Sequence, residues 1–120
     1  MSTKTEWYTF RQNNSFGKLV QTEDLDVWVI IEAFTLEDAL RRAEKIGLYF
    51  DGCAEGRDCN CCGDRWYPPQ SVGKEPLIYD APMAEHRPLL SRPERAVIHG
   101  IDVPRREVVF EDRAREAGGS

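Results

Sequence analysis

Two segments of the chain carry the apolar pattern of β-strands. Residues 6–11 (EWYTFR) alternate, with Tyr8 and Phe10 on one face and Trp7 on the other, which predicts a strand. Residues 27–33 (VWVIIEA) are apolar at nearly every position, which is typical of a strand covered on both faces. The second segment therefore predicts the middle of a sheet.

One amphipathic helix is predicted directly after this central strand. Thr35 can cap its first turn, and Gly47 supplies the left-handed residue that commonly ends a helix. Apolar residues recur at helical spacing and form one stripe: Leu36, Ala39, Leu40, Ala43 and Ile46. Oppositely charged residues stand one turn apart on the solvent face: Glu37 with Arg41, and Asp38 with Arg42.

The second half of the chain is less regular. A short strand is expected at residues 76–79, and two late strands are expected at residues 95–99 (RAVIH) and 107–111 (EVVFE). Three prolines indicate an extended surface connection over residues 81–93. This order predicts an α+β fold in which one helix packs on a small, mostly antiparallel sheet.

The length of 120 residues suits one domain. We expect that domain to span residues 1–112, followed by a flexible tail at residues 113–120. A single helix covers only one face of the sheet, so the second face needs another cover. The cover is the cysteine-rich loop with Trp66 and Tyr67, the Pro-rich segment that follows, or a partner chain.

The loop at residues 51–66 (DGCAEGRDCNCCGDRW) holds every cysteine of the chain: Cys53, Cys59, Cys61 and Cys62. Zinc prefers a tetrahedron of thiolate or imidazole ligands, and the two-residue gap between Cys59 and Cys62 lets both sulfurs face one ion. Cys61 is the nearest candidate for the fourth ligand. Adjacent cysteines usually point apart, however, so His99 or His86 could take the place of Cys61. The sequence therefore predicts one structural Zn²⁺ in a cysteine-rich loop.

Two other interpretations of the cysteines stay open. They are unpaired thiols that bind nothing, or Cys59 and Cys62 form a redox pair. A polar, glycine-rich loop is a poor place to bury four separate thiols, which favours the metal. His86 stands between Glu85 and Arg87 and is expected to be exposed.

Composition narrows the choice of function. The formal net charge of −5 argues against a protein that binds DNA nonspecifically, and it suits a partner with a basic surface. The polar N-terminal residues resemble no signal peptide, and no apolar run is long enough to span a membrane. We therefore expect a cytoplasmic protein, in a compartment where cysteines bind metal more often than they form disulfides.

Single-stranded nucleic acid is an alternative ligand. Aromatic and polar side chains near the N-terminus could form a stacking platform: Trp7, Tyr8, Phe10, Arg11, Gln12, Asn13 and Asn14. Alternating aromatics on a strand more often fill the core. Enzymatic activity is a further alternative, but the chain holds no GxSxG, HExxH, P-loop or Rossmann motif.

Four strings resemble a family of small tailed-bacteriophage proteins: FRQNNSFG, IIEA, RAEKIGLYFDGC and GRDCNCCGDRW, within residues 10–66. The resemblance implies a setting, the cytoplasm of an infected bacterium, and no mechanism. The central strand that is apolar on both faces, the acidic balance and the lack of a catalytic motif favour a zinc-stabilised accessory protein that binds a host or phage protein, with a homodimer as a further possibility.

Overall fold

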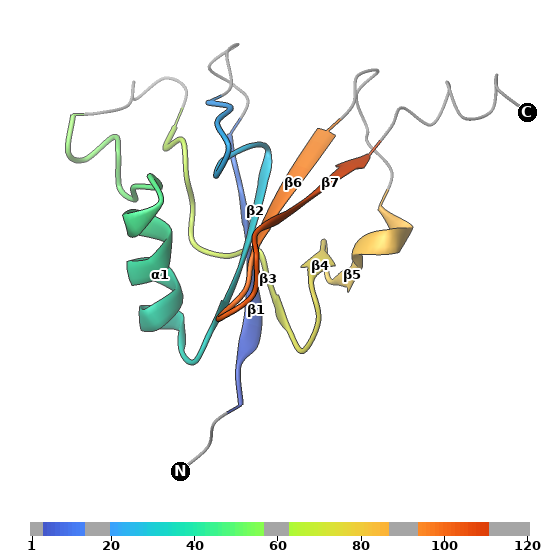
Figure 1. Ribbon diagram of the computed structural model, residues 1–120. Coiled ribbons are helices and arrows are strands. Elements are labelled where there is room, and N and C mark those ends of the chain that lie inside the picture. The colour runs from blue at the N-terminus through green and yellow to red at the C-terminus, as the bar shows by residue number, and fades with distance from the viewer. Residues whose placement is uncertain (1–3, 14–19, 57–62, 87–93, 111–120) are drawn as a thin grey trace, which may run out of the picture.

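A computed structural model describes residues 4–13, 20–56, 63–86 and 94–110 (Figure 1). Its elements, in chain order, are β1 (Glu6–Arg11), β2 (Trp28–Ala33), α1 (Leu36–Lys45), β3 (Ser71–Gly73), β4 (Leu77–Ile78), β5 (Ala81–Pro82), the 3₁₀-helix η1 (Met83–Glu85), β6 (Glu94–His99) and β7 (Arg106–Phe110). The predicted α+β fold is confirmed: α1 packs on a mostly antiparallel sheet.

The sheet has five strands in the order β3-β1-β2-β6-β7. Every neighbouring pair is antiparallel except β2 and β6, which run parallel with Trp28 opposite Ala96. Parallel strands need a crossover connection, and here the chain passes through α1, β3 and the β4–β5 hairpin before it returns. The strand β2 is central, as its apolar pattern predicted.

The strand β1 divides its side chains between two cores. Tyr8 and Phe10 belong to the core under α1, together with Val29 and Ile31 of β2. Trp7 packs against the core on the opposite face. The alternation predicted for residues 6–11 is therefore confirmed, and both faces of the sheet are buried.

The helix α1 begins and ends where its signals predicted. Thr35 Oγ1 accepts a hydrogen bond from the Asp38 N–H at 3.0 Å, and Gly47 follows the helix with φ of 117°. Ala39 and Ala43 are fully buried against the sheet, whereas Leu36 at the first turn is 48% exposed. The predicted apolar stripe therefore holds except at its N-terminal end.

Asp38 differs from its predicted place on the solvent face. Its side chain is 9% exposed and accepts hydrogen bonds from Arg42 Nε at 2.9 Å, from Arg41 and from the Phe34 N–H at 3.2 Å. Arg41 therefore pairs with Asp38 rather than with Glu37. This cluster joins the first turn of α1 to the end of β2, which keeps the turn between them tight.

The second face of the sheet is covered by β4, β5 and η1. Figure 1 shows α1 on one side of the sheet, and β4, β5 and η1 on the other. Ile78 is 2% exposed in the second core, and Met83 packs against it. Trp66 lies instead in the core under α1. The extended connection predicted for residues 81–93 is therefore wrong over Ala81–Glu85, where the chain forms β5 and η1.

The β4–β5 hairpin turns through two left-handed residues that are not glycine. Ile78 pairs with Ala81, and the two residues between them, Tyr79 and Asp80, have φ of 52° and 61°. Such a turn ordinarily takes Asn-Gly or Asp-Gly, because a side chain is strained at positive φ. The Asp80 N–H donates to Ser71 Oγ at 2.9 Å, which ties the turn to β3.

Candidate functional site

The two ends of the cysteine loop are held together at the end of β1. The Cys53 N–H donates to Asp64 Oδ1 at 2.9 Å. Asn13 makes two hydrogen bonds to the C-terminal end of the loop, from its N–H to the Arg65 carbonyl at 2.8 Å and from Nδ2 to the Asp64 carbonyl at 3.0 Å. The segment 57–62, which carries Cys59, Cys61 and Cys62, lies between these pinned ends and outside the described residues.

Gly63 fits a crowded turn at the far end of the loop. Its φ is 83°, and an added Cβ would lie 2.6 Å from Tyr67 Oη and 3.5 Å from Asn13 Nδ2. Gly56 at the near end also has a positive φ, 78°, with open space around it. Both glycines therefore allow a left-handed backbone at the two ends of the segment that carries the cysteines.

Gln12 joins the cysteine loop to the core. Its buried side chain donates from Nε2 to the carbonyls of Val20 and Asp26, both at 3.1 Å. Its Oε1 accepts from the Val20 N–H at 2.7 Å and from Arg65 Nη1 at 2.9 Å. Because its amide nitrogen and its amide oxygen are both occupied, Gln12 positions the side chain of Arg65 and has no hydrogen-bonding edge left for a base to recognise.

The predicted nucleic-acid platform is largely inside the protein. Tyr8 is 5% exposed and Phe10 is fully buried, with its ring centroid 5.7 Å from that of Phe50. Burial, with the nearby charges of Glu6 and Asp38, raises the pKa of Tyr8. A base cannot stack on these rings without opening the core.

The remaining platform residues have other contacts. Arg11 lies over Trp28, with its guanidinium carbon 5.6 Å from the ring centroid, and Asn13 anchors the cysteine loop. Asn14 lies outside the described residues. The described platform residues therefore belong to the two cores or to the anchor of the cysteine loop.

No group of three potential metal ligands occurs among the described residues, which include only Cys53 of the four cysteines. His99, the substitute ligand, lies at the end of β6, and its Nε2 is 2.9 Å from the Asp24 carbonyl. A carbonyl only accepts, so Nε2 carries a proton in this contact. The zinc ion stays a prediction, and His99 has a structural partner.

The sequence missed a buried polar cluster on the second face. Glu94 Oε1 accepts a hydrogen bond from Trp28 Nε1 at 2.9 Å and lies 2.8 Å from His86 Nε2. The side chains of His86 and Glu94 are 6% and 8% exposed. The expectation that His86 is exposed is therefore wrong, because η1 turns its ring onto the sheet.

Aromatic rings enclose this cluster. The His86 ring stands edge-on to Phe110 at 4.8 Å and to Trp28 at 5.4 Å between centroids, and Tyr79 lies 6.3 Å away. Rings on these sides leave a substrate little access to the imidazole, so the pair stabilises the cover. The sequence contains one signal for this polar cluster. Glu94 lies on the same strand face as the apolar residues Ala96 and Ile98, and a charge on a buried face needs a partner.

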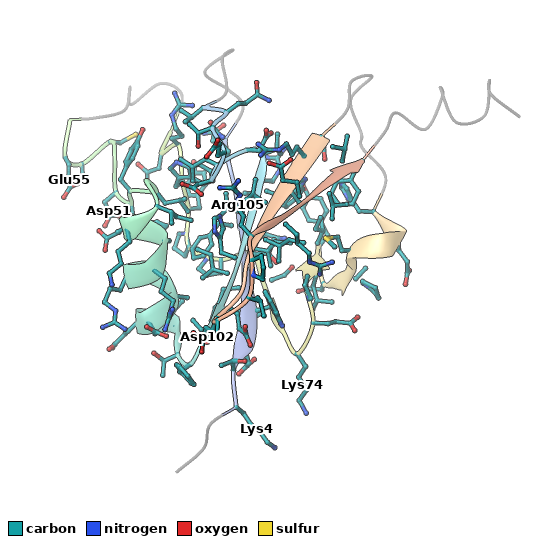
Figure 2. The ribbon with its side chains drawn as sticks, in the orientation of Figure 1. Lys4, Asp51, Glu55, Lys74, Asp102 and Arg105 are labelled. Carbon is teal, nitrogen blue, oxygen red and sulfur yellow. The ribbon has the colours of Figure 1, made fainter. Side chains whose placement is uncertain are left out.

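An exposed hollow lies at the opposite end of β1 from the cysteine loop. We call it the lysine hollow. It has a volume of about 540 Å³ and is lined by Lys4, Thr5, Glu6, Phe34 and Lys74. Figure 2 shows Lys4 and Lys74 projecting from the end at which β1 begins, and Asp51 and Glu55 near the far end of α1. Phe34 is 48% exposed, so its ring is available for contact within the hollow.

The chain was compared with protein families, curated proteins and solved structures. The profile of a domain of unknown function, DUF7296, matches residues 5–114. Neither a curated protein nor a solved structure matches the chain. Among the described residues, no helix has the length and apolar character to cross a bilayer. Because the match covers most of its length, this chain belongs to the DUF7296 family.

Proposed function

We propose that this protein is a small, zinc-stabilised bacteriophage accessory protein that acts in the cytoplasm of an infected bacterium by binding a host or phage protein. The phage setting follows from the resemblance of residues 10–66. The zinc and the binding surface rest on separate features at opposite ends of the sheet, so each is tested by itself.

The zinc proposal is supported by the pinned ends of the cysteine loop. The bond between Cys53 and Asp64 brings the half-buried Cys53 to the base of a six-residue segment that carries the other three cysteines. Four thiolates make a closed, structural zinc site without an open position for a substrate. Such a site would order the loop and add stability to a domain of modest size.

The binding proposal is carried by the exposure of Phe34 in the lysine hollow. An aromatic side chain surrounded by a polar and charged rim has the arrangement that is typical of the centre of a protein–protein interface. Two of the four lysines of the chain line this hollow, although the net charge is −5. A partner that presents an apolar side chain flanked by carboxylates would complement both features.

The binding test uses purified, zinc-containing protein and extract of the infected host. The protein captures a partner, and the interaction is then measured with the two purified components. Phe34→Ala is expected to weaken binding at least tenfold, as a central aromatic anchor does. Val109→Ala is the matched control, because Val109 is 57% exposed on β7 at the other edge of the sheet.

Retained binding by Phe34→Ala would place the interface elsewhere. Equal loss in both variants would indicate general damage rather than a site. Salt-sensitive binding of single-stranded oligonucleotides, with no protein captured, would instead support the nucleic-acid alternative.

A further inference from the structure

A second cavity lies between the C-terminal half of α1 and the sheet. Its volume is about 200 Å³, and it is lined by Ile31, Glu32, Arg42, Lys45, Ile46, His99 and Gly100. It shares no lining residue with the lysine hollow. Sites for drug-sized ligands measure roughly 300–1,000 Å³, so this cavity suits a smaller molecule.

The architecture accounts for the cavity. The helix α1 packs mainly on β2, and the loop that contains Leu25 fills the space next to Gly47. The Asp24 carbonyl of that loop binds His99 at the end of β6. The cavity is what stays open between the helix and the ends of β2 and β6.

Charge in the cavity favours an anion. Arg42 and Lys45 contribute two positive charges from the last turn of α1. Arg42 uses Nε to bind Asp38, and that bond does not involve its two terminal nitrogens. Glu32 is the opposing charge, but Thr5 Oγ1 donates to its Oε2 at 2.5 Å and the Ile101 N–H donates to its Oε1 at 2.8 Å. The carboxylate keeps its negative charge, but its oxygens already have partners within the protein, and Arg42 and Lys45 leave one positive charge in excess among the lining residues.

Ile31 and Ile46 supply apolar wall, and His99 supplies a fixed ring. We propose that this cavity binds a fragment-sized phosphate monoester, whose phosphate oxygens face Arg42 and Lys45 and whose organic part lies against the isoleucines. A phosphate offers three acceptor oxygens, which suits the guanidinium of Arg42 together with the ammonium of Lys45 better than the two oxygens of a carboxylate do.

Phenyl phosphate is the probe, and benzyl alcohol is the control with a similar apolar body and no charge. Each is titrated into the full-length, zinc-containing protein while amide chemical shifts are recorded. We expect phenyl phosphate to shift the amides of Arg42, Lys45, His99 and Gly100 with one saturable curve and a dissociation constant of about a millimolar or below. Benzyl alcohol should leave these amides nearly unchanged.

Lys45→Ala and Lys45→Gln are expected to weaken binding of phenyl phosphate about threefold to tenfold, and Lys74→Ala in the lysine hollow should bind as the wild type does. Positive charge in the last turn of α1 also offsets the helix dipole. If that is the whole role of Lys45, its variants lose stability and keep their affinity, which would overturn the proposal. Shifts that do not saturate, or equal shifts with benzyl alcohol, would also overturn it.

Discussion

The imidazole of His86 lies 2.8 Å from the carboxylate of Glu94, inside the second core. Only hydrogen-bond donors satisfy a carboxylate, so His86 Nε2 donates to it and shares Oε1 with the Trp28 indole. This contact attaches the 3₁₀-helix η1 to β6 and closes the cover over the sheet.

His86→Ala should lower the free energy of unfolding by roughly 2–4 kcal/mol, because it removes packed ring atoms and leaves a buried carboxylate with one partner fewer. Urea denaturation followed by tryptophan fluorescence measures the change. Glu85→Ala, on the exposed side of the same short helix, is the control and should change stability by less than about 0.5 kcal/mol. Similar values for the two variants would mean that the pair does not hold the cover in solution.

The cluster around Asp38 makes stability depend on acid pH. Burial opposes ionisation of Asp38, but hydrogen bonds from Arg42, Arg41 and the Phe34 N–H prevail and lower its pKa to about 2. A folded-state pKa below the unfolded value of roughly 3.9 means that the ionised carboxylate stabilises the fold above about pH 4. That contribution disappears as the pH falls from about 4 to 2.

Asp38→Asn should therefore cost roughly 1–2 kcal/mol at pH 7, because the arginines are partly exposed to solvent. The cost should shrink as the pH falls from about 4 to 2, because Asp38 becomes protonated and the two proteins then differ less in charge. Thermal unfolding at several pH values measures this difference, with Glu37→Gln on the exposed face as the control. A cost that is constant with pH would exclude ionisation of Asp38 as its source.

Metal removal tests the cysteine loop. Protein purified without added metal should contain about one zinc per chain, and a chelator should lower its melting temperature. Cys59→Ser and Cys62→Ser should lose both the zinc and the stability, whereas Glu55→Ala, an exposed carboxylate in the same loop, should keep both. Metal-free protein that melts unchanged in the presence of a chelator would contradict a structural zinc.

The strained hairpin turn predicts a stabilising substitution. Asp80→Gly removes a side chain from the left-handed position and keeps the N–H that binds Ser71, so the free energy of unfolding should rise by about 0.5 kcal/mol. Asp80→Ala should lower it by about 1 kcal/mol, since alanine gains nothing from a left-handed backbone. Urea denaturation distinguishes these signs, and an equal effect of both variants would show that the backbone conformation is not the cause.

Local signals predicted the first half of the fold. The alternation around Tyr8, the apolar run that includes Ile30 and the caps at Thr35 and Gly47 each act over a few residues, so the sequence displays them directly. Leu36 departs from the predicted stripe because its neighbours in space, not its helical spacing, decide its burial.

The cover of the second face could not be predicted in the same way. Ala81–Pro82 and Met83–Glu85 are too short to show a period, and the place of His86 depends on Glu94 and Phe110, which follow later in the chain. The lysine hollow joins Lys4, Phe34 and Lys74 from three separate segments. No regular spacing in the sequence indicates that these three residues lie close together in the fold.

The parallel pairing of β2 with β6 affects how the chain folds. The contact between Trp28 and Glu94 spans 66 residues, so the middle of the sheet cannot form until most of the polypeptide has left the ribosome. Until then β2 exposes one long edge and an apolar face to the cell. Rapid completion of synthesis, or a chaperone held on β2, would protect the nascent chain during that interval.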